Sequence, residues 1–317
     1  MKLTKTLSLI FAAALAAASL TACSGGNSSV SESNSSDTST SQSTPENTSA
    51  DPSSESAPAD SAENLAYSPE NPVTVKIGLT GNVYEDIWDP IKAKLAPEGI
   101  ILEYEQFTAF NIPNNALNSG EIDINAFQHH AYFNNDTSTN GYDLAVLGDT
   151  YIVAMNIYGG KLDSIDAALN SDSKIKVAVP NDVTNEGRAL KLLSEAGFFT
   201  FTEDVGAAPE ISDIEQYNVE IEFVEVDANL VPTVKDDVDI AVINGNYALD
   251  AGLTADDAIY KESKYDDNSY YCLIAARSED ADNPVFKRIV EAYQTQDTID
   301  IYNNEFKGFF VPAWTLE

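Results

Sequence analysis

Hydrophobic and polar positions along the chain fall into two successive series of strand-like and helix-like segments. In the first series, residues 73–80 alternate as a strand does, and residues 84–95 carry Ile87, Trp88 and Ile91 at helical spacing. The expected elements are a strand over 73–80, a helix over 84–95, a strand over 100–107, a helix over 112–119 and a strand over 122–127. Strands that alternate with helices predict a parallel sheet with helical crossovers.

The second series begins at Lys174, after a polar stretch over 134–142 that we interpret as a loop and a segment over 144–158 that is long enough to reach another lobe. Its expected elements are a strand over 174–179, a helix that begins near Asn185, a strand over 219–226, a short helix over 231–234, strands over 239–244 and 270–277, and one long helix over 286–306. Two such series predict an α/β protein of two lobes with a ligand cleft between them. We assign residues 71–155 and 268–317 to lobe I and residues 156–267 to lobe II.

The N-terminus has the pattern of a secretory signal. Lys2 and Lys5 precede an apolar run over 7–18, which is too short to span a bilayer, so we interpret residues 1–22 as a signal peptide. The segment Leu20-Thr21-Ala22-Cys23 resembles a lipobox, which predicts lipid attachment at Cys23 and an anchor on the extracytoplasmic face of the cell membrane. A plain signal peptide with a chance cysteine is the alternative.

Composition narrows the function classes. Residues 23–70 are rich in Ser, Thr, Asn, Pro and acids, a composition typical of a disordered tether. The net charge of −34 argues against nucleic-acid binding, because a phosphate backbone requires a basic surface. The second cysteine, Cys272, lies in an apolar run and reads as a core residue. The two histidines, His129 and His130, are adjacent and their side chains diverge, so we expect no metal and no cofactor.

One turn carries the clearest candidate chemistry. Residues 181–187 form a polar turn between an expected strand and an expected helix, and Arg188 follows it. A helix N-terminus offers unpaired N–H groups at its positive end, and an arginine beside it supplies a planar, two-toothed grip for a carboxylate. An ordinary turn with a solvated arginine is the alternative interpretation.

From about Val73 to Trp314 the chain resembles the methionine-binding lipoproteins of bacterial ABC importers, the MetQ/NlpA type. The matching segments are Phe127-Gln128-His129 with Tyr132, Pro180-Asn181-Asp182 with Thr184-Asn185 and Gly187-Arg188-Ala189-Leu190, Ile243-Asn244 with Asn246-Tyr247-Ala248, Glu291-Ala292-Tyr293-Gln294 and Val311-Pro312-Ala313-Trp314. The resemblance implies a periplasmic-binding-protein fold of type II, with the ligand between the lobes. It also implies that no catalytic residue is present.

The same resemblance implies roles for individual residues. Arg188, helped by Asn185, would hold the α-carboxylate of the ligand, and Asn244 would hold the polar end of the amino acid from a neighbouring strand. The side-chain pocket would be formed by His129, Tyr132, Phe110 and Phe127. Phe110 stands where the family often has tyrosine, which removes one hydroxyl from the site. We interpret Tyr151 and Tyr247 as packing residues.

The expected function is capture of L-methionine and delivery to the permease of an ABC importer, by a monomer anchored to the membrane through its N-terminal lipid. Another amino acid, D-methionine or a methionyl dipeptide is the alternative cargo. A lipid-anchored surface enzyme or an adhesin is the alternative of a different class. The enzyme would require a nucleophile with an adjacent base, and the chain carries none of the usual sequence motifs for one.

Overall fold

A computed structural model of the chain describes residues 67–203, 205–265, 267–306 and 309–316. The expected signal peptide, Cys23 and most of the tether therefore lie outside the described residues. The described residues belong to one compact unit. Among them, no helix is both long enough and apolar enough to cross a bilayer.

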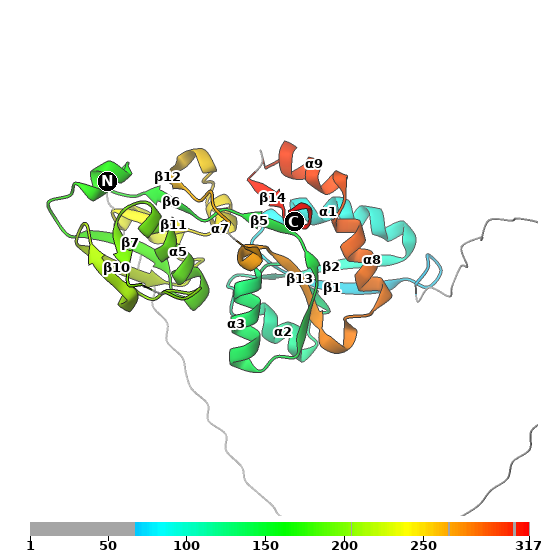
Figure 1. Cartoon of the computed structure of the whole chain (residues 1–317). Helices are drawn as coiled ribbons and strands as arrows, with labels where there is room; N and C mark the ends of the chain where they lie inside the picture. The colour runs from blue at the N-terminus through cyan, green and yellow to red at the C-terminus, as the bar shows by residue number, and fades with distance from the viewer. Residues whose placement is uncertain (1–66, 204, 266, 307–308, 317) are drawn as a thin grey trace, which may run out of the picture. The chain divides into compact units, whose positions relative to one another are not determined.

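The first sheet contains the elements of the first series together with a strand from near the C-terminus (Figure 1). Its strand order is β2-β1-β3-β13-β4, with bounds Ile100–Phe107, Val73–Thr80, Ile124–Asn125, Leu273–Arg277 and Leu144–Asp149. The strands β1, β2 and β3 run parallel, as predicted, whereas β13 is antiparallel to both β3 and β4. The accompanying helices are α1 (Val83–Leu95), α2 (Pro113–Ser119), α3 (His130–Asn140), α8 (Pro284–Tyr293) and α9 (Gln296–Asn304).

The second sheet has the order β10-β7-β11-β6-β12, with bounds Ile221–Val226, Ile175–Pro180, Ile240–Ile243, Asn156–Gly159 and Ala258–Lys261. The strands β10, β7 and β11 are parallel, and β6 and β12 are antiparallel additions at one side. The helices in this part are α4 (Ile165–Leu169), α5 (Val183–Glu195), α6 (Val231–Val234) and α7 (Gly245–Asp250). A hairpin that the pattern did not predict, β8 (Phe199–Phe201) with β9 (Ile214–Tyr217), follows α5.

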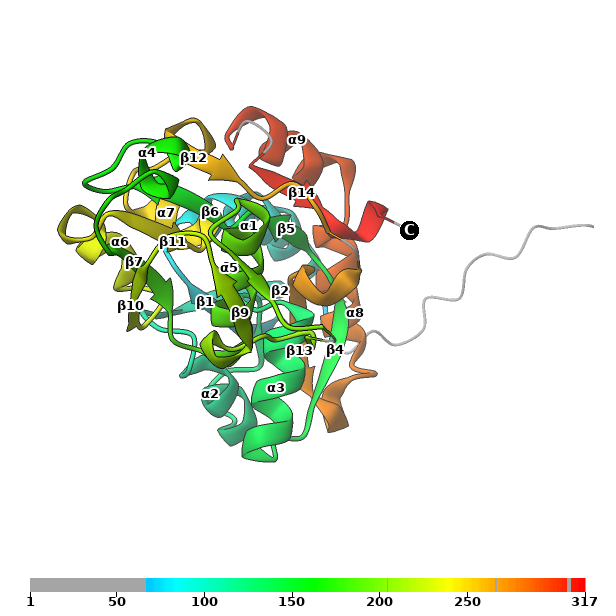
Figure 2. The ribbon, with the colours of Figure 1, turned by 60° about the vertical axis from the view of Figure 1, so that its left-hand side comes forward.

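The chain passes between the sheets twice, from β4 to β6 and from β12 to β13. The first passage contains β5 (Tyr151–Val153), which pairs with the last strand, β14 (Phe310–Pro312) (Figure 2). The C-terminal strand is thus attached to a connecting segment. The lobe boundaries inferred from the sequence stay a prediction about how this unit divides.

Each sheet has an apolar core of its own. In the first core, Trp88 of α1 packs on Tyr293 of α8 with ring centroids 4.7 Å apart, and both side chains are at most 1% exposed. Complete burial of one large apolar side chain is worth roughly 1.5–3 kcal/mol, so these aromatic residues are major contributors to the stability of this core. Trp314, in the last turn, packs on Tyr293 and Tyr302. Cys272 is a buried member of the same core, as expected.

The α7 helix of the second part contacts the start of α1 in the first. Asn82 precedes α1 and makes no side-chain cap, and the Asp250 carboxylate accepts the N–H groups of Asn82 and Val83, each at 3.3 Å. Gly81 permits this contact, because it has a φ of 108° and a Cβ built on it would lie 2.8 Å from Asp250 Oδ2. A carboxylate from one sheet's helices therefore caps a helix of the other.

The prediction of a loop over 134–142 is wrong, because most of this polar stretch belongs to the helix α3. Polar residues occur on all sides of α3, so no apolar stripe identifies it. Its ends carry the signal instead, since the His129 side chain accepts a hydrogen bond from Tyr132 N and Gly141 ends the helix with a φ of 70°.

The prediction of a single long helix over 286–306 is also wrong, because this segment is divided into α8 and α9. Gln294 leaves the helical region with a ψ of 61°, and Thr295 is extended, with a ψ of 164°. The polar run over 294–298 marks this break in the apolar spacing. Four strands are also shorter than predicted: β3 has two residues, β10 begins at Ile221, β11 spans Ile240–Ile243, and the segment 268–270 is a 3₁₀ turn that precedes β13.

Candidate functional site

A small cavity of about 20 Å³ lies where the segments that follow β3, β7 and β11 meet. All seven residues predicted as ligand contacts line it: Phe110, Phe127, His129, Tyr132, Asn185, Arg188 and Asn244. It is also lined by Tyr84, Gln128, Val153, Gly245, Asn246 and Cys272, which the sequence analysis did not assign to the site. We call this the inner cavity. The structure thus brings the predicted residues together, and their contacts with a ligand stay a prediction.

The turn after β7 positions Asn185 through the acid that caps α5. Asp182 Oδ1 accepts the Asn185 N–H at 3.0 Å, and the Asn185 side-chain amide donates to both Asp182 oxygens at 3.0 Å. Burial raises the pKa of Asp182, and these hydrogen bonds partly offset the effect. Because its amide nitrogen is held by Asp182, Asn185 presents its side-chain oxygen to the inner cavity.

His129 lies between β3 and α3, in the part of the fold that contains the first sheet. From there it contacts Asn185 of α5, which belongs to the part that contains the second sheet. Its Nδ1 accepts the Tyr132 N–H at 3.1 Å, so the proton of the neutral ring is on Nε2, which donates to Asn185 Oδ1 at 3.2 Å. Burial, followed by the nearby Arg188, lowers the pKa of His129 to about 3. His129 is therefore a neutral donor at physiological pH.

Asn244 directly follows β11 and has one polar atom without a partner. Its amide nitrogen donates to Asn185 Oδ1 at 2.8 Å. Its own oxygen is buried and has no hydrogen-bond partner among the described residues. A buried acceptor without a partner is costly, so this oxygen is a candidate to accept a hydrogen bond from a ligand ammonium group.

Arg188, in α5, forms an ion pair with Glu262, which the sequence analysis did not identify. Nε donates to Glu262 Oε1 at 2.7 Å and Nη2 to Glu262 Oε2 at 2.5 Å, and the two side chains are only 4% and 8% exposed. Nη2 also donates to Val153 O at 3.0 Å. Burial would lower the pKa of Arg188, but the Glu262 carboxylate more than compensates, and the pKa lies above its ordinary value.

This pairing changes how Arg188 could hold a carboxylate. The sequence predicts that Arg188 binds a carboxylate in a bidentate manner, but the Nε–Nη2 edge of its guanidinium is already occupied by Glu262. Among the described residues Nη1 has no hydrogen-bond acceptor, so Nη1 is the part of the guanidinium that remains to donate to a ligand. The Tyr270 ring covers the guanidinium, with its centroid 4.4 Å from the Arg188 carbon. Nothing in the local sequence around Glu262 distinguishes it from the many exposed acids of this chain.

Aromatic rings form the apolar wall of the inner cavity. The Phe110 ring lies 5.9 Å from Phe127 and 6.0 Å from Tyr132, between centroids. Tyr247 packs on Phe110 at 4.8 Å, and Tyr151 is a buried core residue against Phe310, in agreement with the packing role expected for both tyrosines. A thioether gains from contact with such rings.

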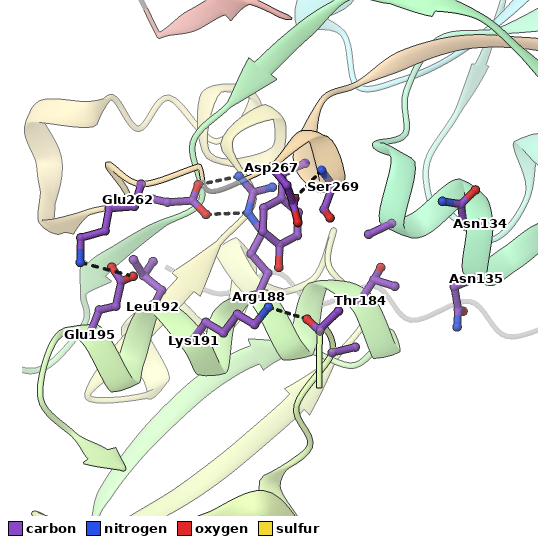
Figure 3. A pocket seen from close by; sticks show the side chains of 15 residues that line it. Asn134, Asn135, Thr184, Arg188, Lys191, Leu192, Glu195, Glu262, Asp267 and Ser269 are labelled. Atoms are coloured by element: carbon purple, nitrogen blue, oxygen red, sulfur yellow. Dashed lines mark hydrogen bonds and ion pairs between the residues drawn. The ribbon is translucent and has the colours of Figure 1, made fainter. Parts of the chain in front are cut away.

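A second, wider cavity of about 400 Å³ is lined by both Arg188 and Glu262 (Figure 3). We call this the outer cavity. It is lined by α5 residues such as Lys191 and Glu195 and by α3 residues such as Asn134. Figure 3 shows Glu262 paired with one edge of the Arg188 guanidinium. Glu195 is the last residue of α5. Among the described residues, no group of three or more His, Cys, Asp or Glu side chains is arranged to hold a metal ion.

Comparisons with known proteins agree with this arrangement. D-methionine-binding lipoprotein MetQ of Escherichia coli K12 is 34% identical over 250 residues, which are 77% of this chain and 90% of the relative. A solved nutrient-binding protein from Burkholderia cenocepacia bound to methionine has a TM-score of 0.70 at 35% identity and is covered over 99% of its length and 75% of this chain. Protein PG110 from Staphylococcus aureus has a TM-score of 0.72 at 32% identity, over 94% of its length and 75% of this chain.

These comparisons confirm the predicted fold class, a two-lobed α/β binding protein. The relatives of known function are binding proteins of transporters and not enzymes. The family model of the NlpA lipoproteins matches residues 75–314, which is nearly the whole described region. The chain therefore belongs to the NlpA lipoprotein family.

Proposed function

We propose that this chain is a lipid-anchored, extracytoplasmic binding protein that captures methionine and delivers it to an ABC importer. One observation carries the proposal: the Arg188 guanidinium lines the inner cavity together with Asn244 Oδ1, a buried acceptor without a hydrogen-bond partner among the described residues, beside an aromatic wall. A zwitterionic amino acid with an apolar side chain has the complementary groups. The names of the Escherichia coli and Burkholderia relatives, which refer to methionine, support the same ligand.

Capture requires the inner cavity to open. At about 20 Å³ it is smaller than an amino acid, and the His129–Asn185 hydrogen bond closes it between the two parts of the fold. A ligand that contacts residues on both sides stabilises the closed arrangement, which a permease can distinguish from the open one. Binding and release thus need only a change in the population of two states, and no chemical step.

Isothermal titration of residues 24–317, refolded to remove carried-over ligand, tests the ligand. We expect one methionine per chain and measure both enantiomers, because the Escherichia coli relative is named for D-methionine. Arg188→Ala should abolish binding, whereas Lys191→Ala, one turn along α5 and hydrogen-bonded among the described residues to Ala207 O alone, should leave it unchanged. Binding of another amino acid or a methionyl dipeptide instead would change the cargo, and sustained turnover of an ester or amide would replace the proposal by an enzyme.

The anchor and the delivery step need cellular tests. Cys23→Ser should move the protein from the membrane fraction to the soluble fraction while its ligand binding is unchanged. Deletion of the chain should abolish methionine uptake at low external concentration, and the Arg188→Ala variant should fail to restore it. Normal uptake by the deletion strain would contradict the transport role. Retention of the Cys23→Ser variant on the membrane would contradict the lipid anchor.

A further inference from the structure

We infer that Glu262 is a positioning residue that determines ligand specificity: by pairing with Arg188 it makes the inner cavity select a zwitterionic amino acid over the corresponding anion that lacks an amino group. This inference rests on the proposed function. It follows from which charges line the inner cavity and from how Glu262 is held beside them.

Arg188 is the only formally charged side chain among the described residues that line the inner cavity. The His129 ring is neutral, and burial raises the pKa of the Cys272 thiol to about 12, so it is neutral as well. The remaining lining residues are amides, phenols and apolar groups. A buried cavity with one uncompensated positive charge would favour any small carboxylate, with or without an ammonium group.

Glu262 compensates this charge without lining the inner cavity itself. Its carboxylate is fixed from three directions, by Arg188 Nε, by Arg188 Nη2 and by Met155 N–H, which donates to Oε2 at 2.8 Å. Its own N–H donates to Asn156 Oδ1 at 3.1 Å. Glu262 therefore cannot swing away when a ligand arrives, and the guanidinium meets the ligand as one half of a neutral pair.

Glu262 has opposite effects on the binding of an amino acid and of the corresponding anion that lacks the ammonium group. A ligand carboxylate is attracted by Arg188 and repelled by Glu262, so the pair reduces its net gain. A ligand ammonium is repelled by Arg188 and attracted by Glu262, so the pair removes its penalty. An amino acid therefore depends on Glu262, and an anion without the ammonium is held back by it. Asp182 lies behind Asn185, and since the variants below all retain it, its charge does not affect their comparison.

The test compares methionine, as the enantiomer that binds better, with 2-hydroxy-4-(methylthio)butanoate, which keeps the carboxylate, the thioether and one donor for Asn244 Oδ1. Both dissociation constants are measured on residues 24–317 of the wild type and of Glu262→Gln. The wild type should bind the hydroxy acid at least thirtyfold more weakly than methionine. Glu262→Gln should shift this ratio at least tenfold toward the hydroxy acid, because one charge at short range has been removed.

Glu195→Gln is the matched control. Glu195 also lines the outer cavity and its loss changes the net charge equally, but its partner is Lys264, at 3.8 Å. Its ratio should stay within twofold of the wild type. Glu262→Asp keeps the charge and should keep the ratio within threefold, even where both affinities fall.

The outcomes separate the inference from the proposed function. If wild-type protein does not bind methionine, the proposed function fails and the inference fails with it. If methionine binds and Glu262→Gln weakens both ligands equally, Glu262 has only a structural role and the inference alone is overturned. If Glu262→Gln does not fold, the dissociation constants of the wild type alone are used. A hydroxy acid whose dissociation constant lies within threefold of that of methionine then overturns the inference.

Discussion

His129 Nε2 donates a hydrogen bond to Asn185 Oδ1, and this bond joins the residue before α3 to the first turn of α5. A second bond at the same ring, from Tyr132 N–H to His129 Nδ1, requires the neutral form, because protonation would place a hydrogen on Nδ1. Protonation would remove that acceptor and place a second positive charge near Arg188. The buried environment of His129 and its bond from Tyr132 N–H thus favour the neutral ring.

We therefore expect the protein to lose stability as the pH decreases below about 6.5. The folded-state pKa of His129 is about 3, well below the ordinary histidine pKa of about 6.5, so the unfolded chain binds this proton first as pH decreases. The free energy of unfolding should decrease below pH 6.5, with a slope approaching about 1.4 kcal/mol per pH unit from this residue alone. Urea unfolding of wild type and His129→Gln between pH 7.5 and 5 measures the difference in slope. Equal slopes would refute the assignment.

Breaking the buried Arg188–Glu262 pair should be costly, whereas removing it completely should not be. Glu262→Ala leaves Arg188 buried without its counter-charge, and we expect a loss of about 3–5 kcal/mol in the free energy of unfolding. The double variant Arg188→Met with Glu262→Ala should recover most of that loss. Urea unfolding of the four proteins in this cycle measures the coupling, and additive losses would contradict a direct pairing.

Phe110 should contribute to the recognition of the ligand side chain and not of its polar end. Phe110→Ala removes a ring that contacts both Phe127 and Tyr132, so methionine affinity should fall about tenfold, while the weaker binding of alanine should change little. Titration of both ligands gives the ratio. Phe201→Ala, in the β8–β9 hairpin, is the control and should leave the ratio unchanged. An equal loss for both ligands would show that Phe110 acts only through folding.

The Asp250 cap on α1 should influence closure from outside the inner cavity. Asp250→Asn retains the shape and removes the charge at the helix N-terminus, and we expect about 1 kcal/mol lower stability. If the cap also stabilises the closed arrangement, methionine affinity should fall a few-fold although no lining residue has changed. Asp256→Asn, an exposed acid paired with Lys261, serves as control. Unaltered stability and affinity of Asp250→Asn would mean that water replaces the cap without cost.

Elements with a clear periodic pattern could be predicted from the sequence. The strand over 100–107 and the short helix over 231–234 have the predicted bounds, because apolar spacing and turn residues agree there. The helix α3 could not be found by that method, because its stability derives from two buried residues in its first turn and from its caps. The division between α8 and α9 was visible only as a polar run inside an otherwise continuous apolar pattern.

The candidate site was predictable to the extent that its residues directly follow strands. Asn185 and Asn244 follow β7 and β11 in the order that brings parallel strand ends together, and the resemblance to a known family identified them. Glu262 lies in a connecting segment, 74 residues from Arg188 in the chain, and no spacing rule links the two. Long-range pairs of this kind become visible only when the chain is folded.

The attachment of β14 to β5 has a practical consequence for anyone who labels this protein. Phe310 pairs with Val153, and Val153 O accepts a hydrogen bond from Arg188 Nη2, so the last strand of the described residues supports the guanidinium through β5. Trimming the final residues, or fusing a bulky fluorophore to them, would therefore disturb the support of Arg188 in the candidate site. Reporter groups and purification tags therefore belong on the N-terminal side of the first described strand, far along the chain from this support.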